Sequence, residues 1–267
     1  MPNKVAIAIA AHPDDIEFQM AGTLLLLKQA GYETHYLNLA SGNCGSAEYN
    51  GAATRAIRNT EARAAAKILG AQFHPGFADD LEITYSLELL HLLAAIIREV
   101  KPAIILTHSP QDYMEDHTAT CRLTVTAALA RGMGNFKTVP ARPVGDYKVT
   151  IYHAMPHGLR DDLYRRVIPG AFVNTTSVHK AKREALAMHK SQQAWLDVSQ
   201  GLDSHLLVME NMSLEVGRMS KRFKHAEGWR RHNYLGFCAP HADPLAQALG
   251  RKHLPNKAYE RILEKGY

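Results

Sequence analysis

Four apolar runs alternate with four helix-like segments in the first half of the chain, and this alternation constrains the fold most strongly. The runs are typical of buried strands, and they cover residues 5–11, 34–40, 72–76 and 103–107. Helical spacing of apolar residues follows each run, at residues 17–30, 54–69, 86–100 and 117–130. Strands that alternate with helices predict a parallel sheet with right-handed crossovers. We therefore predict a Rossmann-like α/β fold, an open and mostly parallel sheet with helices on both faces.

The second half of the chain is patterned less regularly. Gly and Pro residues predict a long loop at 132–146. Strands are expected at 148–153 and 171–173, and helices at 178–189 and 201–220. From His225 onward we expect irregular structure until a final helix at 257–265. We expect one domain at 1–192 and a C-terminal helical extension, 193–267, packed on that domain.

A polar cluster stands at the end of the first apolar run, where His12, Asp14 and Asp15 surround Pro13. Pro13 favours extended angles at His12, so a tight turn can bring His12 and Asp15 to one point. Adjacent carboxylates point different ways, so one can bind a metal while the other accepts a proton. The alternative is a capping box, in which Asp14 and Glu17 satisfy the amides of the following helix.

A second polar cluster follows the fourth apolar run. It contains Asp116 and His117 at the start of a helix, with His108 and Asp112 in the loop before them. Two strand ends that each carry His and Asp suggest one shared metal site. His117 is the natural third ligand, and Asp116 would lie behind it and fix the imidazole tautomer. Here too the alternative is that Asp116 only caps the helix.

These residues resemble the LmbE-like (PIG-L) family of zinc-dependent N-acetylglucosaminyl deacetylases. The match rests on AHPDDIE at 11–17, HSPQDYMEDH at 108–117, RNTE at 58–61 and HKSQ at 189–192. The resemblance covers about residues 4–192. It implies a metal-dependent hydrolase that removes the N-acetyl group from an amino sugar or sugar conjugate.

The resemblance also implies roles for individual residues. His12, Asp15 and His117 correspond to the zinc ligands, and Fe²⁺ suits the same donors. Asp14 corresponds to the general base, and His189 to a histidine near the substrate carbonyl. Candidate substrate contacts are Arg58, Asn43, His108 and Asp112.

One position departs from the family pattern. A histidine usually stands three residues before the last ligand, and here that residue is Met114. A thioether donates no hydrogen bond, and losing one oxyanion donor costs about 10²–10³ in rate. Two alternatives follow: an amidase or esterase acting on a non-sugar substrate, or a catalytically weak metal- or sugar-binding protein.

Composition limits the remaining classes. The 267 residues carry a net charge of +5 without a recognisable nucleic-acid motif. We find no apolar run long enough to span a membrane and no signal sequence. Cys44, Cys121 and Cys238 are too few and too widely spaced for a disulfide framework, which favours a reducing, cytoplasmic location. The expected partner is a small amino-sugar substrate, and the resemblance implies a homo-oligomer, with a hexamer or trimer possible.

Overall fold

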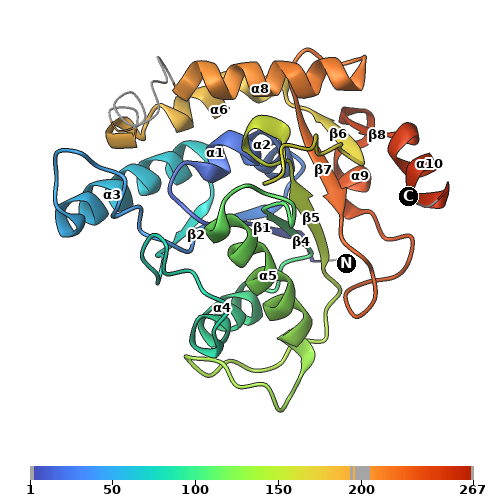
Figure 1. Ribbon diagram of the computed structural model, residues 1–267. Coiled ribbons are helices and arrows are strands. Elements are labelled where there is room, and N and C mark those ends of the chain that lie inside the picture. Colours follow the sequence, from blue (N-terminus) through green and yellow to red (C-terminus); the bar gives the residue numbers. More distant parts are fainter. Residues whose placement is uncertain (1–2, 193–194, 196–204, 266–267) are drawn as a thin grey trace.

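A computed structural model describes residues 3–192, 195 and 205–265. These residues form eight strands that pair in one sheet, in the order β3-β2-β1-β4-β5-β7-β6-β8 (Figure 1). The strands are β1 Val5–Ala10, β2 Glu33–Asn38, β3 Gln72–His74, β4 Ile104–Thr107, β5 Thr150–Ala154, β6 Ala171–Asn174, β7 Ala226–Arg231 and β8 His253–Pro255.

The first five strands in this order pair in parallel, with β1 between β2 and β4. β7 is antiparallel to both β5 and β6, and β8 is antiparallel to β6. The sheet is mixed but mostly parallel, which confirms the predicted α/β class.

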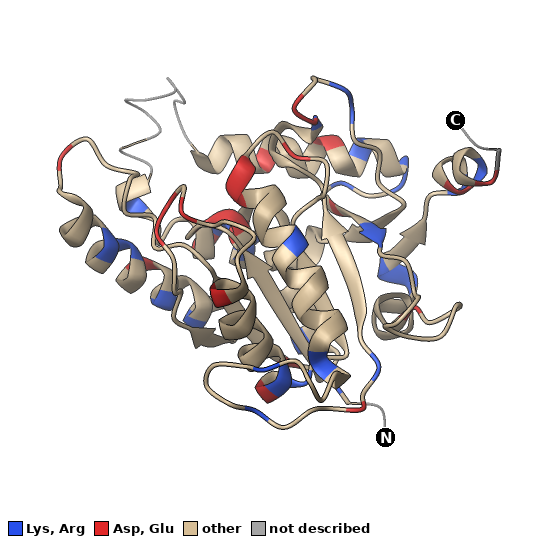
Figure 2. Cartoon of the chain, turned by 60° about the horizontal axis from the view of Figure 1, so that its bottom comes forward, with Lys and Arg blue, Asp and Glu red and all other residues tan. Residues whose placement is uncertain are grey.

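Helices cover both faces of this sheet (Figure 1). They are α1 Asp15–Gln19, α2 Ala21–Gln29, α3 Gly51–Leu69, α4 Leu87–Val100, α5 Glu115–Leu129, α6 His179–Leu186, α8 His205–Ser220, α9 Pro244–Leu249 and α10 Lys257–Lys265. Basic residues recur along α3 in Figure 2, whereas acidic residues gather in loops near the centre of that view. None of the described helices combines the length and the apolar composition of a transmembrane segment.

β1 is buried on both faces and forms the centre of two hydrophobic cores. Ala6 and Ala8 face the core that contains the leucines of α2 and the alanines of α3. Ile7 and Ile9 face the core formed with α4 and α5. Side chains of a strand alternate between faces, so small residues leave room for α2 and α3 to pack closely on one side.

The helix expected at residues 17–30 is two helices. It begins at Asp15 and is interrupted at Met20, where φ is −131°. α3 begins earlier than expected, because the side chain of Asn50 caps it by accepting from the amide of Ala53. Gly70 ends α3 in the left-handed conformation with φ 64°, which favours glycine. For the helix expected at 201–220, residues 201–204 lie outside the described part of the chain.

The expectation of irregular structure after His225 is wrong, because Ala226–Arg231 form β7 in the middle of the mixed half of the sheet. Its Glu227 is buried and accepts hydrogen bonds from the amides of Gly22 and Thr23 and from Lys182 Nζ at 2.7–2.8 Å. A charged strand residue is tolerated inside a protein only with such partners. These partners come from α2 and α6, so the local sequence alone does not predict the strand.

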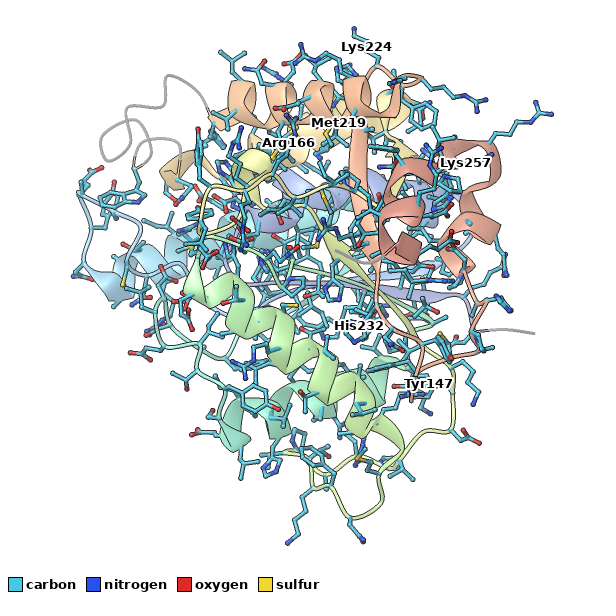
Figure 3. All side chains as sticks on the ribbon, turned by 45° about the vertical axis from the view of Figure 1, so that its right-hand side comes forward. Tyr147, Arg166, Met219, Lys224, His232 and Lys257 are labelled. Carbon is cyan, nitrogen blue, oxygen red and sulfur yellow. The ribbon has the colours of Figure 1, made fainter. Side chains whose placement is uncertain are left out.

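α8 covers the antiparallel part of the sheet. Its Val216, Met212 and Met219 pack against Phe172 of β6 and Ala226 of β7 (Figure 3, where Met219 is labelled). Residues from the predicted C-terminal extension therefore contribute both a covering helix and two strands to the same sheet. The proposed division at residue 192 marks a change of sequence pattern within one layered structure.

Candidate active site

The candidate site lies at the carboxyl ends of β1 and β4. The connection after β1 passes over one face of the sheet, while the connection before β4 uses α4 on the other face. Ligands of open α/β sheets bind at such a reversal of strand order. A pocket of about 250 Å³ opens there, and both predicted polar clusters contribute to its wall.

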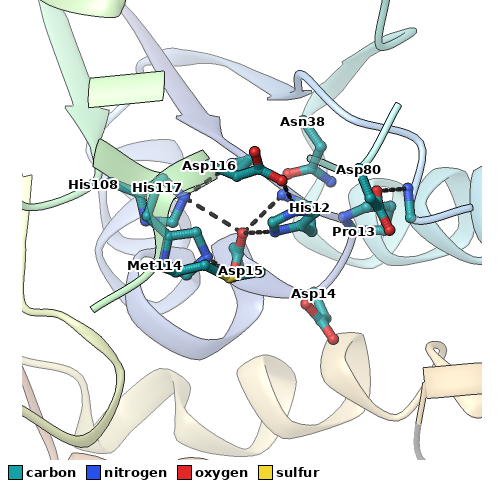
Figure 4. Close-up of polar contacts among 12 residues, drawn as sticks. His12, Pro13, Asp14, Asp15, Asn38, Asp80, His108, Met114, Asp116 and His117 are labelled. Carbon is teal, nitrogen blue, oxygen red and sulfur yellow. Dashed lines mark hydrogen bonds and ion pairs between the residues drawn. The ribbon is translucent and has the colours of Figure 1, made fainter. Parts of the chain in front are cut away.

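Three predicted ligands converge in this pocket. One donor atom each from His12, Asp15 and His117 lies within 4.8 Å of the other two. Asp15 is in the middle, with His12 Nδ1 at 3.4 Å from its Oδ2 and His117 Nε2 at 3.3 Å from its Oδ1 (Figure 4). The backbone amide of His12 also donates to Asp15 Oδ2 at 2.7 Å. The turn after β1 and the first turn of α5 therefore bring two imidazoles and one carboxylate together.

Each of these imidazoles has a second carboxylate on its outer nitrogen. His12 Nε2 lies 2.9 Å from Asp116 Oδ2, and His117 Nδ1 lies 3.1 Å from Asp112 Oδ1. The prediction that Asp116 lies behind His117 is thus wrong. Successive helical residues point about 100° apart, so Asp116 turns toward His12 while the preceding loop supplies Asp112.

The carboxylates control protonation of the two imidazoles. Burial alone would lower the pKa of His12, but hydrogen bonds to Asp116 and Asp15 raise it to about 9. Burial likewise opposes the raised pKa of His117, which Asp15 and Asp112 bring to about 10. The charge of His117 holds the pKa of Asp15 well below its usual range against the effect of burial. A divalent cation would replace these protons, and nitrogen and oxygen donors backed by carboxylates suit zinc.

Asp14 lies apart from these contacts in Figure 4. Its backbone has φ 101° and ψ −27°, a conformation that non-glycine residues rarely adopt and that is typical of functional sites. It precedes α1 without a side-chain capping bond in the described structure, so the capping-box alternative is wrong. Burial raises the pKa of Asp14 to about 6, against the opposing charge of Arg58, whose Nη2 lies 3.6 Å from its carboxylate.

Glu17, the other half of that alternative, is fully buried below the turn. It accepts a hydrogen bond from the Tyr36 hydroxyl at 3.2 Å and lies 3.5 Å from His189 Nε2. His189 is also fully buried, and its imidazole lies close enough to Asp14 for its charge to lower the pKa of that carboxyl. His189 therefore lies behind the pocket wall, beside Asp14 and Glu17.

The loop after β2 is held by side chains rather than by regular structure. Arg58 donates to the carbonyl of Gly42 at 3.3 Å, and a Cβ at Gly42 would meet this guanidinium at 2.5–2.6 Å. Asp80 accepts from the amides of Gly42 and Cys44 at 2.7 and 3.0 Å. Asn43 Oδ1 accepts from the amide of Asp80 at 2.9 Å, so Asn43 fixes the loop.

His108 packs against the site through His117. Its ring stacks on His117, with centroids 4.1 Å apart and planes 8° from parallel. The amide of Ala11 donates to His108 Nε2 at 2.9 Å, so that nitrogen accepts and the proton is on Nδ1. Burial lowers the pKa of His108, which keeps the ring neutral. Its role in this geometry is to position His117.

The pocket wall also contains residues outside the predicted site set, among them His157, Tyr113 and Asp80. Tyr113 packs edge-on to His117 and lies near His157, with ring centroids 6.0 and 6.4 Å apart. Burial lowers the pKa of His157, so its imidazole is neutral at neutral pH. His157 follows β5, and the rule that sites form at carboxyl ends of parallel strands could have selected it.

The structural comparison agrees with this architecture. The chain aligns with the crystal structure of a 4-carboxy-2-hydroxymuconate hydratase from Pseudomonas putida with a TM-score of 0.71. The two chains are 25% identical, and the alignment covers 85% of this chain and 95% of the hydratase.

Sequence comparison gives relatives with two different activities. A diacetylchitobiose deacetylase of Thermococcus kodakarensis is 28% identical over 234 residues, which cover 85% of this chain and 82% of the relative. A 4-oxalmesaconate hydratase of Pseudomonas putida is 29% identical over 204 residues, which cover 72% and 75%. The PIG-L family model, described as GlcNAc-PI de-N-acetylase, matches residues 7–128. Over residues 7–128, which include the turn after β1 and the start of α5, this chain therefore carries a PIG-L (LmbE-like) family domain.

Proposed function

We propose that this protein is a metal-dependent N-deacetylase that removes the acetyl group from an N-acetylglucosamine-type sugar or sugar conjugate. The observation that carries the proposal is a buried carboxylate, Asp14, held in a strained turn beside three converging ligand residues. A site that only binds metal needs no such free carboxylate. The PIG-L match and the deacetylase relative support the same chemistry.

His12, Asp15 and His117 would hold the metal ion in this proposal. Zn²⁺, or Fe²⁺ with the same donors, would supply Lewis-acid polarisation of water and of the substrate carbonyl. Asp116 is hydrogen-bonded to the outer nitrogen of His12 at 2.9 Å, and Asp112 lies 3.1 Å from that of His117, so the two carboxylates would keep the imidazoles oriented. We therefore assign Asp112 to orientation of His117 and not to substrate contact.

Asp14 is the proposed general base. Its pKa of about 6 leaves it ionised at neutral pH, yet basic enough to take a proton from the attacking water. The same carboxyl would then return that proton to the departing amine. Arg58 and His189 lie beside Asp14, and we propose that both tune its basicity rather than react themselves.

His157 is the proposed replacement for the missing oxyanion donor. Met114 lines the pocket but cannot donate a hydrogen bond. His157 lines the same pocket, and its neutral ring carries one N–H that can reach a substrate oxygen. We assign it the task of stabilising charge on the carbonyl oxygen during attack.

We propose that the outer pocket receives the sugar ring of the substrate. Phe18, Tyr113 and Trp195 give it aromatic walls, and Asp80 and Gln192 add polar groups. Aromatic walls with a few placed polar groups are typical of small-molecule sites. Asn43 does not line this pocket but holds the loop at its side by accepting from the amide of Asp80, so its proposed effect on substrate binding is indirect.

We propose a cytoplasmic location and a homo-oligomeric assembly. Three free cysteines, one of them exposed, agree with a cytoplasmic protein. A homo-oligomer is proposed from the family resemblance alone.

The test is acetate release from N-acetylglucosamine conjugates, measured with and without a chelator. Asp14→Asn should lower turnover about 10²–10⁴-fold while the bound metal stays constant. A chelator should abolish the wild-type activity. Full metal content without acetate release from any acetamide would refute deacetylation, and an active Asp14→Asn protein would refute the role of Asp14.

A second candidate is a metal-dependent hydratase acting on an unsaturated carboxylate. The hydratase relative and the TM-score of 0.71 to a hydratase structure favour it. Met114 also weakens the case for amide cleavage. Hydration adds water without releasing acetate, so loss of the conjugated-alkene absorbance of a 4-oxalmesaconate-type substrate would identify this activity.

A further inference from the structure

A second histidine cluster lies outside the candidate active site. His179 begins α6, Glu210 lies on α8, and His225 immediately precedes β7. One ligand-type atom from each lies within 4.8 Å of the other two. His179 and His225 are 8% and 6% exposed, and their rings stack with centroids 3.8 Å apart and planes 6° from parallel. Three separate segments thus bring two imidazoles and one carboxylate close together, and the two rings would tilt out of their stack to direct one nitrogen each at a shared ion.

The ring nitrogens of this stacked pair are buried without hydrogen-bond partners. This holds for Nδ1 and Nε2 of both His179 and His225 among the described residues. The stack of His35 on His74 differs, because His35 Nδ1 and His74 Nε2 are hydrogen-bonded at 2.8 Å. An imidazole donor left unsatisfied in the interior costs about 1–3 kcal/mol. Stacking alone therefore does not explain why two such rings are buried together.

Two hydrogen bonds fix the backbone at His225. The amide of Thr175 donates to the His225 carbonyl at 3.0 Å, and the His225 amide donates to the Thr176 hydroxyl at 3.1 Å. The ring itself is placed by its stack on His179, the first residue of α6. A preorganised donor set binds a metal with less loss of side-chain freedom than a flexible one.

The electrostatic surroundings allow a cation here. Burial lowers the pKa of His179 to about 4 and also lowers that of His225, so both rings are neutral, as metal ligands must be. The positive charges of Lys182, Lys224 and Arg183 also lower the pKa of His179. Of these residues, Lys182 is buried and forms an ion pair with Glu227 at 2.7 Å. Lys224 is exposed at the top of Figure 3, where water screens its charge.

We propose that His179, Glu210 and His225 form a second divalent transition-metal site, with zinc as the expected ion. Two imidazoles and one carboxylate are a common zinc donor set, completed by water. No cysteine takes part, and all three residues lie outside the PIG-L match at 7–128. The bound ion would link α6 to α8 and to the start of β7. It is thus a structural site, independent of the proposed deacetylase chemistry.

Metal stoichiometry tests this site directly. Each protein is stripped with chelator, incubated with a small excess of Zn²⁺, desalted and analysed by elemental mass spectrometry. We expect about two ions per wild-type chain and about one in His225→Phe, which keeps a ring for stacking but offers no nitrogen. His117→Phe should also hold about one, and the double variant about none.

Thermal unfolding supplies the second readout and the controls. Zn²⁺ should raise the Tm of His117→Phe, because a ligand that binds only the folded state stabilises it. In the double variant His117→Phe/His225→Phe, Zn²⁺ should no longer raise the Tm. If His225→Phe folds poorly, Glu210→Gln tests the same site at its partly exposed ligand. His74→Phe removes the ring nitrogens from the His35–His74 stack, which belongs to neither cluster, and should leave zinc content unchanged. Equal zinc content in wild type, His225→Phe and Glu210→Gln would overturn the proposal, whatever His117→Phe does.

Discussion

The two histidine clusters use the same donor types but differ in what lies behind each ring. In the active-site cluster, Asp116 contacts the outer nitrogen of His12 and Asp112 that of His117. In the second cluster, the nitrogens of His179 and His225 have no partner among the described residues. Partners on the outer nitrogen fix the tautomer and increase the basicity of a ligand. Under our two proposals, the carboxylates of the first cluster would tune a reactive ion, whereas the second cluster would only hold one.

The same contrast appears in the pKa values. Carboxylates raise the pKa of His12 to about 9 despite its burial, whereas burial lowers that of His179 to about 4. A free carboxylate, Asp14, adjoins only the first cluster within the described structure. We therefore associate the additional carboxylates with the proposed catalytic role of the first cluster. The proposed structural role of the second cluster does not need them.

The largest effect that sharpens this comparison is expected from His157→Phe. Removing the proposed donor should lower kcat by about 10²–10³-fold and leave zinc bound to both clusters. Kinetics with an N-acetylglucosamine conjugate measure kcat, and metal analysis measures the bound zinc. A drop in kcat with loss of zinc would instead make His157 part of the metal site.

A third pair, His153 with His232, serves as a reference in which both His153 nitrogens are satisfied. His153 Nδ1 donates to the His108 carbonyl at 2.8 Å, and Nε2 lies 3.0 Å from His232 Nδ1. Burial lowers the pKa of His153 to about 4, so the unfolded chain binds the proton more readily. Stability contributed by neutral His153 is therefore present above pH 6.5 and is lost as pH falls toward 4.

Between pH 7 and pH 4.5 this effect should reduce the free energy of unfolding by about 2.5 kcal/mol, or about 10² in the equilibrium constant. Urea unfolding in the presence of chelator measures it without a contribution from metal. His153→Gln should show a shallower decline over the same range. An identical decline in both proteins would assign the acid sensitivity to other groups.

Asp112→Asn should weaken zinc binding at the active-site cluster by about 10–100-fold. The second cluster should be unaffected, because no corresponding carboxylate lies behind its rings in the described structure. Competition with a chelator of known affinity separates the two. Asp243→Asn is the matched control, since Asp243 caps α9 and accepts from the Tyr152 hydroxyl away from both clusters.

The smallest effect concerns Met114. Met114→His should preserve turnover or raise it by up to about ten-fold, because a second donor adds to one already present. Met114→Leu, which restores no donor, should produce no increase. A clear loss of rate in Met114→His would mean that the thioether fills a required space.

Sequence patterns predicted the parallel half of the sheet well, because each strand there is a continuous apolar run followed by a periodic helix. They also identified the three residues that converge at the active site, since His12, Asp15 and His117 all follow strands that end at one edge. Their role as metal ligands stays a prediction.

What sequence patterns did not give depends on contacts between distant segments. β7 reads as AEGWRR, and its charge is compensated by Lys182, which lies 45 positions earlier. The direction of α5 decides which carboxylate faces which imidazole, and it places Asp116 beside His12 and Asp112 beside His117. The second cluster joins α6, α8 and the start of β7, and no local motif connects these three elements.

The position of β7 between β5 and β6 has a consequence for synthesis. β6 ends at Asn174 and β7 begins at Ala226, so the nascent chain carries two open strand edges until the later segment leaves the ribosome. At about 5–20 residues per second, these edges stay unprotected for seconds. Open edges pair readily with other chains, so production of this protein should depend on chaperones at high expression rates.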